Sequence, residues 1–167
     1  MKKLLSILIC ILFLVGCSDK ATFTGDATCA DIMQAAVDAT NAPDYDNIYR
    51  YDDENFDSLT MALWAYGLYE ECSEYDLIED CAIYVGAGNI TYEVGVIKPK
   101  EVTDTEKIEQ LFSRRKETMS AGNKAAYDPN FSSLIDDSLI YTDGEFVILL
   151  ITNDNTLAKD AINGLKK

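Results

Sequence analysis

The chain has 167 residues, enough for one domain of ordinary size, and 48% of them are hydrophobic, as in a globular protein. It contains 14 basic and 29 acidic residues, and the net charge of −15 argues against nucleic-acid binding, which needs clustered Lys and Arg. The sequence has no histidine, which excludes Ser-His-Asp and Cys-His hydrolases and His-ligated zinc sites.

The first 16 residues have the pattern of a bacterial lipoprotein signal peptide. Lys2 and Lys3 precede an apolar run of twelve residues (4–15), which is shorter than the ~20 residues of a membrane-spanning helix. The run ends in the sequence LVGC, which is similar to a lipobox. We therefore expect cleavage between Gly16 and Cys17 and attachment of diacylglycerol and a further acyl chain such as palmitate to Cys17. The alternative is an ordinary secretory signal in which Cys17 is incidental.

This pattern places the mature protein on the extracytoplasmic face of the cell membrane. Residues 17–27 are predicted to be the lipidated cysteine and a short polar linker, and residues 28–167 a single domain. Cleavage removes two lysines, so the mature chain has 12 basic and 29 acidic residues and a net charge of −17. Anionic headgroups repel such a domain, so the expected membrane contact is made by the lipid on Cys17.

Helical periodicity predicts the first two elements of the domain. Residues 28–40 begin with a capping box formed by Thr28 and Asp31, and residues 58–66 form a shorter helix that ends at Gly67. We expect two buried apolar stripes: Cys29, Ile32, Met33, Ala36 and Val37 in the first helix, and Leu59, Ala62, Leu63 and Tyr66 in the second.

The pattern then changes to period 2. Residues 81–85 and 90–98 are predicted to form a hairpin. A helix over 103–120 follows, with a capping box of Thr103 and Glu106 and with Arg115 on its solvated side.

Residues 121–137 form a long connection in which we expect a short helical turn. Residues 139–142 and 145–151 form a second hairpin around an Asp-Gly turn. The sequence FVILLI (146–151) is apolar on both faces and is therefore expected at the centre of the sheet. Asn153 or Asp154 caps the last helix.

The predicted order is α-α-β-β-α-β-β-α. Hairpins separated by helices are typical of an α+β domain. We expect a largely antiparallel four-stranded sheet with the helices packed on one face.

Several sequence motifs resemble a known family. They are the sequences YV (84–85) and YEVGVIK (92–98), a charged helix over 104–119, and YxP at 127–129, followed by an apolar hairpin and a terminal helix. These motifs resemble domain of unknown function 4358, small lipoproteins found mainly in Clostridia-type Firmicutes, over about residues 31–167. The resemblance implies a lipoprotein with a single domain and implies no activity.

The cysteines of the mature chain offer little chemistry. Cys72 and Cys81 flank an acidic stretch and are the candidates for a disulfide, while Cys29 lies on an apolar stripe. The acidic residues around Cys72 raise a thiol pKa, which argues against a nucleophile.

Acidic residues are concentrated in residues 26–80, where 15 carboxylates face one base, Arg50. The simplest interpretation is that these carboxylates form a solvated surface. The functional interpretation is binding of a cation or of a cationic partner such as a basic peptide. The candidate calcium ligands are Asp44, Asp46, Asp52 and Asp53. The glycine and the final glutamate of an EF-hand are missing, so the metal signal is weak.

The sequence therefore predicts a membrane-anchored extracytoplasmic domain that is not an enzyme and that binds an envelope protein or a small ligand. No catalytic residues and no cofactor are predicted. The alternative is a hydrolase that uses a pair of carboxylates on an envelope polymer.

Overall fold

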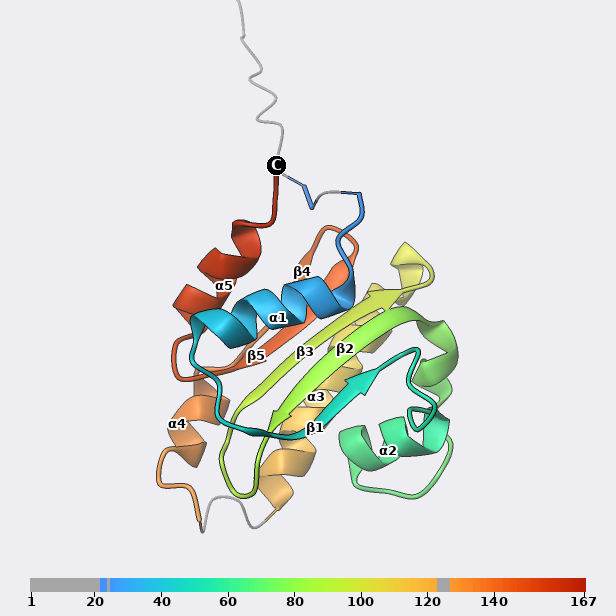
Figure 1. Cartoon of the computed structure of the whole chain (residues 1–167). Helices are drawn as coiled ribbons and strands as arrows, with labels where there is room; N and C mark the ends of the chain where they lie inside the picture. Colours follow the sequence, from blue (N-terminus) through green and yellow to red (C-terminus); the bar gives the residue numbers. More distant parts are fainter. Residues whose placement is uncertain (1–21, 24, 123–126) are drawn as a thin grey trace, which may run out of the picture.

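The computed structural model describes residues 22–23, 25–122 and 127–167, and the predicted signal peptide and Cys17 lie outside them. The domain is built on a five-stranded antiparallel sheet with strand order β1-β2-β3-β5-β4 (Figure 1). The strands are β1 (Tyr45–Arg50), β2 (Ile78–Gly86), β3 (Glu93–Pro99), β4 (Leu139–Asp143) and β5 (Phe146–Ile151). The α-helices are α1 (Cys29–Ala39), α2 (Ser58–Tyr66), α3 (Thr105–Ala121), α4 (Phe131–Asp136) and α5 (Asn155–Asn163).

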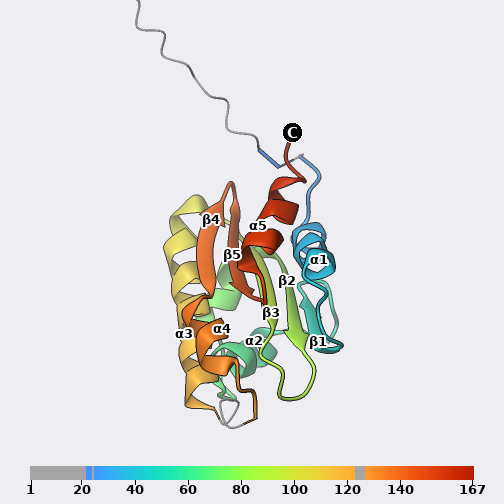
Figure 2. The same ribbon diagram turned by 90° about the vertical axis from the view of Figure 1, so that its left-hand side faces the viewer.

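Helices cover both faces of the sheet, so the expectation of a single covered face is wrong (Figure 2). Helices α1 and α5 pack on one face, and α2 and α3 pack on the other. All six residues of β5 are buried, because this strand lies inside the sheet with helices on both sides of it. Its apolar side chains therefore alternate between two separate cores.

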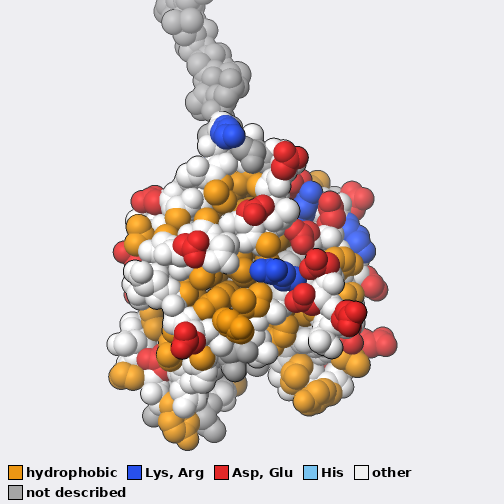
Figure 3. All heavy atoms as spheres, in the orientation of Figure 1, with side chains coloured by type: hydrophobic (Ala, Val, Ile, Leu, Met, Phe, Trp, Pro, Cys, Tyr) orange, Lys and Arg blue, Asp and Glu red, His pale blue; other side chains and the backbone are white. Residues whose placement is uncertain are grey.

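The fifth strand is β1, in a segment for which the sequence predicted no regular structure. It pairs with β2 at the edge of the sheet, with an irregular register between Tyr45 and Asn47. Tyr49 packs toward the α2–α3 core and Ile48 toward the α1–α5 core. Figure 3 shows apolar side chains exposed on the face below α1, where Figure 1 shows strands without a helix over them.

The helix ends agree in part with the sequence. The α1 capping box is confirmed, since Thr28 Oγ1 accepts from the Asp31 amide at 3.2 Å and the Asp31 carboxylate accepts from the Thr28 amide at 3.0 Å. Gly67 ends α2 in the left-handed conformation, as predicted. Helix α3 instead begins at Thr105 after a short 3-10 turn, Val102–Asp104, so the capping box at Thr103 is wrong.

Helix α2 buries only part of the predicted stripe. Ala62 is buried as predicted, but Leu59 and Leu63 are exposed, and Met61 and Trp64 are buried instead. The helix is apolar on nearly every side, so its periodicity does not specify which face packs inward.

The N-terminal segment of the described chain is attached to the C-terminus. Phe23 forms an antiparallel bridge with Lys166, and the Lys167 amide donates to the Thr22 carbonyl at 3.2 Å. The Phe23 ring also packs edge-on against Phe146 of β5, with 5.2 Å between ring centroids. Residues 22–23, expected in the linker, therefore pack against the domain.

The longest described helix, α3, is amphipathic. In the described part of the chain, no helix combines the length and the apolar character needed to cross a bilayer.

Candidate functional site

A cavity of about 470 Å³ opens at one end of the sheet. Four chain segments form it: the α1–β1 connection, the β2–β3 connection, residues 127–134 around the start of α4, and the β5–α5 connection. The volume lies within the range of ligand sites in proteins, about 300–1,000 Å³. In Figure 1 the β2–β3 connection and α4 lie at the lower end of the molecule, and the C-terminus lies at the upper end.

Each of the four segments contributes one asparagine, namely Asn41, Asn89, Asn130 and Asn153. All four are exposed, and none of their side-chain amides is bonded to the described protein. Asn41 follows Thr40, the C-cap residue of α1, and has a positive φ of 48°, a conformation that asparagine adopts more readily than most residues. Four asparagines from four separate segments thus line the same cavity.

One residue of the lining carries an unpaired buried hydroxyl. Thr91 is buried, and its Oγ1 has no hydrogen-bond partner, whereas its backbone amide donates to Asp128 Oδ2 at 2.8 Å. Asp128 Oδ1 accepts from the Asn130 amide at 2.9 Å. Asp128 thus joins residues 127–134 to the start of β3, and both of its carboxylate oxygens are engaged.

Buried polar side chains are concentrated near this cavity. The buried threonines and the buried glutamate each line the cavity or adjoin a lining residue in sequence: Thr40, Thr91, Glu93 and Thr152. Tyr92 Oη lies 2.6 Å from Thr40 Oγ1, which donates to the Ala36 carbonyl at 2.8 Å. Polar groups inside a protein are paired in most cases. The unpaired Thr91 hydroxyl is therefore an exception among these buried polar side chains.

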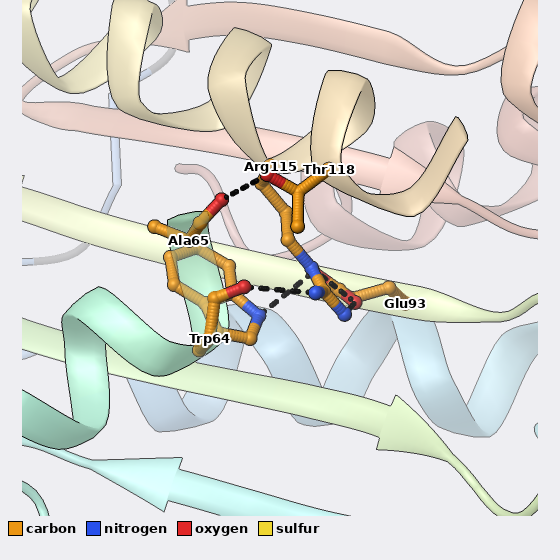
Figure 4. A network of polar contacts seen from close by, with 5 residues as sticks. All are labelled: Trp64, Ala65, Glu93, Arg115 and Thr118. Carbon is orange, nitrogen blue, oxygen red and sulfur yellow. Dashed lines mark hydrogen bonds and ion pairs between the residues drawn. The ribbon is translucent and has the colours of Figure 1, made fainter. Parts of the chain in front are cut away.

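A buried ion pair holds the first residue of β3 next to the cavity (Figure 4). Glu93 is 0% exposed, and Arg115 of α3 donates to both of its carboxylate oxygens, with 2.6 Å between Nη2 and Oε2. Trp64 Nε1 donates to Glu93 Oε1 at 3.0 Å, and Arg115 Nη1 donates to the Trp64 carbonyl at 2.8 Å. Thr118 Oγ1 donates to the Ala65 carbonyl at 2.8 Å. The network joins α2, α3 and β3, and it fixes the start of the strand that Thr91 and Tyr92 directly precede.

The solvated location predicted for Arg115 is therefore wrong. Arg114, its neighbour, is exposed and pairs with Glu117, as expected for the outer side of α3. The sequence signal that was missed is the isolated Glu93 within an apolar strand, because a buried carboxylate requires a cationic partner.

The candidate calcium ligands are not brought together. Asp44 precedes β1, and Asp52 and Asp53 follow it. The six residues of β1 at about 3.3 Å each separate the two groups by about 20 Å. The side chain of Asp46 lies outside the described set. Among the described side chains, no group of three or more Cys, Asp or Glu is placed to hold a metal ion.

The cysteines offer no reactive thiol in the described domain. Cys29, Cys72 and Cys81 are all buried and free, so the expected Cys72–Cys81 disulfide is not formed in this structure. Burial and a hydrogen bond to Glu74 raise the pKa of Cys72 to about 11. Burial also raises the pKa of Cys29 and Cys81. A thiol with a raised pKa is a poor nucleophile at neutral pH.

Fold and cavity together define an α+β domain with a cavity at one end of its sheet, lined by both polar and apolar residues. Residues 52–152 match the model of the family described as Domain of unknown function (DUF4358), and the chain belongs to this family. The match is shorter than the expected 31–167, and it includes the Glu93 network but not Asn41 or Asn153. No curated protein and no solved structure matches the chain.

Proposed function

We propose that this protein is a lipid-anchored extracytoplasmic binding protein whose ligand occupies the cavity between Asn41 and Asn153. The observation that carries this proposal is the position of the cavity: the β2–β3 connection and α4, which contribute to its lining, lie at the end of the molecule opposite to the attached N-terminal segment (Figures 1 and 2). An anchor on Cys17 would then direct the cavity away from the membrane.

The tether is short in this arrangement. Because the Thr22 carbonyl is bonded to the C-terminus, the chain from Cys17 to Thr22 reaches at most about 18 Å. The domain would therefore stay close to the bilayer surface, with its cavity facing away from the bilayer. The negative charge of the mature chain leaves the lipid as the membrane contact.

The chemistry of the cavity favours binding over hydrolysis. A glycosidase mechanism needs two carboxyl groups about 5–10 Å apart. Among the described lining residues Asp128 is the one carboxylate, and its oxygens accept hydrogen bonds from the amides of Thr91 and Asn130. Asp128 is thus used to shape the cavity.

The anchor is tested with two cysteine variants of the full-length chain in a bacterium that processes lipoproteins. Cys17→Ser is expected to abolish labelling by radioactive palmitate and to leave the protein unprocessed or released. Cys10→Ser is the matched control, because Cys10 lies in the apolar run and leaves with the signal peptide. Labelling and membrane retention of Cys17→Ser at the wild-type level would refute the anchor.

A further inference from the structure

We infer that the cavity binds an uncharged saccharide, with the amides of Asn89 and Asn153 and the ring of Tyr127 making the principal contacts. This inference deepens the proposed function and rests on it. Three properties of the lining point to this ligand class: its hydrogen-bonding groups, its charge and its apolar surfaces.

The hydrogen-bonding groups suit hydroxyls. A side-chain amide offers two donors and a carbonyl acceptor, and a sugar hydroxyl both donates and accepts, so the two pair in either direction. Four asparagines whose side-chain amides have no bonds to the described protein line the cavity from four different segments.

The charge of the lining argues against ionic ligands. No Lys or Arg is among the described lining residues, so a phosphate or a carboxylate would lack the cation that normally binds it. Asp128 is the one acidic residue there, and its two oxygens already accept backbone amides. The described lining therefore offers a cationic ligand no carboxylate whose oxygens are not already hydrogen-bonded.

Apolar surfaces complete the match to a saccharide. Tyr127 is 66% exposed at the cavity, and Ile90 is 48% exposed beside it in the lining. One face of a pyranose ring presents C–H groups, which pack on an aromatic ring while the hydroxyls at the ring edge reach polar groups. An exposed tyrosine gives such a contact at low entropic cost, because its ring has few rotatable bonds.

The test is isothermal titration of the full-length protein, purified in detergent, with uncharged oligosaccharides. The probes are chitotetraose, cellotetraose, maltotetraose and mannotetraose, with tetragalacturonate as a charged counterpart and a pool of random decapeptides as a different ligand class. The variants are Tyr127→Ala and Asn89→Ala, both at exposed positions. Tyr69→Ala is the matched control, because Tyr69 is 84% exposed and does not line the cavity.

We expect at least one uncharged oligosaccharide to bind and tetragalacturonate to bind more weakly or not at all. Loss of the stacked ring or of one amide is expected to weaken binding by roughly two- to tenfold, and Tyr69→Ala is expected to bind like the wild type. Binding that is unchanged in both cavity variants would overturn the inference.

The failure of this inference is distinguishable from the failure of the proposed function. If the decapeptides bind in a Tyr127-dependent manner and the saccharides do not, the binding function stands and the saccharide is refuted. If neither class binds the folded protein, both are refuted, whatever the outcome for the lipid anchor.

Discussion

The charge pair of Glu93 and Arg115 is the most consequential contact at the scale of single residues. Glu93 has no exposed surface, and the Arg115 side chain is 12% exposed. Removing two charges from water costs several kcal/mol per ion, and good geometry with further hydrogen bonds is needed to offset that cost. Here the geometry is bidentate, and Trp64 supplies the additional donor.

Substitution Arg115→Ala is expected to destabilise the domain by about 3–5 kcal/mol, because it leaves a buried carboxylate without its cation. Arg114→Ala is the control one residue away, and removing this exposed pair is expected to cost no more than about 1 kcal/mol. Urea unfolding followed by circular dichroism measures both. Equal losses of stability in the two variants would show that the burial of the Glu93 carboxylate does not depend on Arg115.

At the scale of elements, the packing of α3 on β3 depends on a glycine. A Cβ at Gly95 would lie 2.8 Å from Cε1 of Phe112, which is closer than side chains pack. Phe112 also meets Trp64 edge-on, with ring centroids 6.0 Å apart, and therefore has little room to move. The Phe112 ring of α3 thus lies directly against the backbone of β3 at Gly95.

We expect Gly95→Ala to lower the free energy of unfolding by about 1–3 kcal/mol through overpacking. Gly25→Ala is the matched control, since a Cβ at Gly25 meets nothing within 4 Å. Thermal melts of the two variants distinguish them. A Gly95→Ala protein as stable as the control would mean that α3 shifts away from the sheet without cost.

The elements also show what the sequence can predict. The α1 cap and the Gly67 stop depend on local signals and are confirmed, and β5 lies in the interior of the sheet, although β3 is the central strand. β1 was missed because its alternating aromatic and acidic residues are equally typical of a surface loop, and only pairing with β2 makes it a strand. The covering of both faces was missed because the direction in which each helix crosses the sheet is set by tertiary packing.

At the scale of the whole molecule, the stability of the folded domain is expected to fall both at acidic pH and at alkaline pH. Hydrogen bonds from Thr28 and Thr60 lower the pKa of Asp31 and Asp57, so their contribution to stability is present above pH ~4 and is lost as the pH falls through the lowered values. Burial raises the pKa of Cys72 to about 11 and that of Tyr92 to about 12. Their contribution is complete below pH ~9 and is lost as the pH rises through those values.

The melting temperature is therefore expected to be nearly constant between about pH 6 and 8.5, because no histidine titrates there. It is expected to fall below pH ~4 and above pH ~10. Calorimetric scans in buffers of matched ionic strength measure this profile. A transition in stability near pH 6.5 would contradict it.

The candidate site was less predictable than the fold. Asn41, Asn89, Asn130 and Asn153 each follow or precede a regular element, where asparagine is an ordinary turn or cap residue. Nothing in the spacing of these four residues indicates that they meet, because the sheet order β2-β3-β5 brings their segments together. The unpaired Thr91 hydroxyl is likewise a property of the packed domain alone.

The attachment of Phe23 to Lys166 has a mechanical consequence. If the proposed ligand holds the cavity and the proposed anchor holds Cys17 in the membrane, tension enters the domain first at this bridge. This small contact at the end of the chain is then expected to detach before α1 is loaded. Its release lengthens the tether by residues 22–27, about 20 Å when extended, while the sheet and both cores stay folded. The docked segment would then act as a force-limiting link between the bilayer and the binding domain.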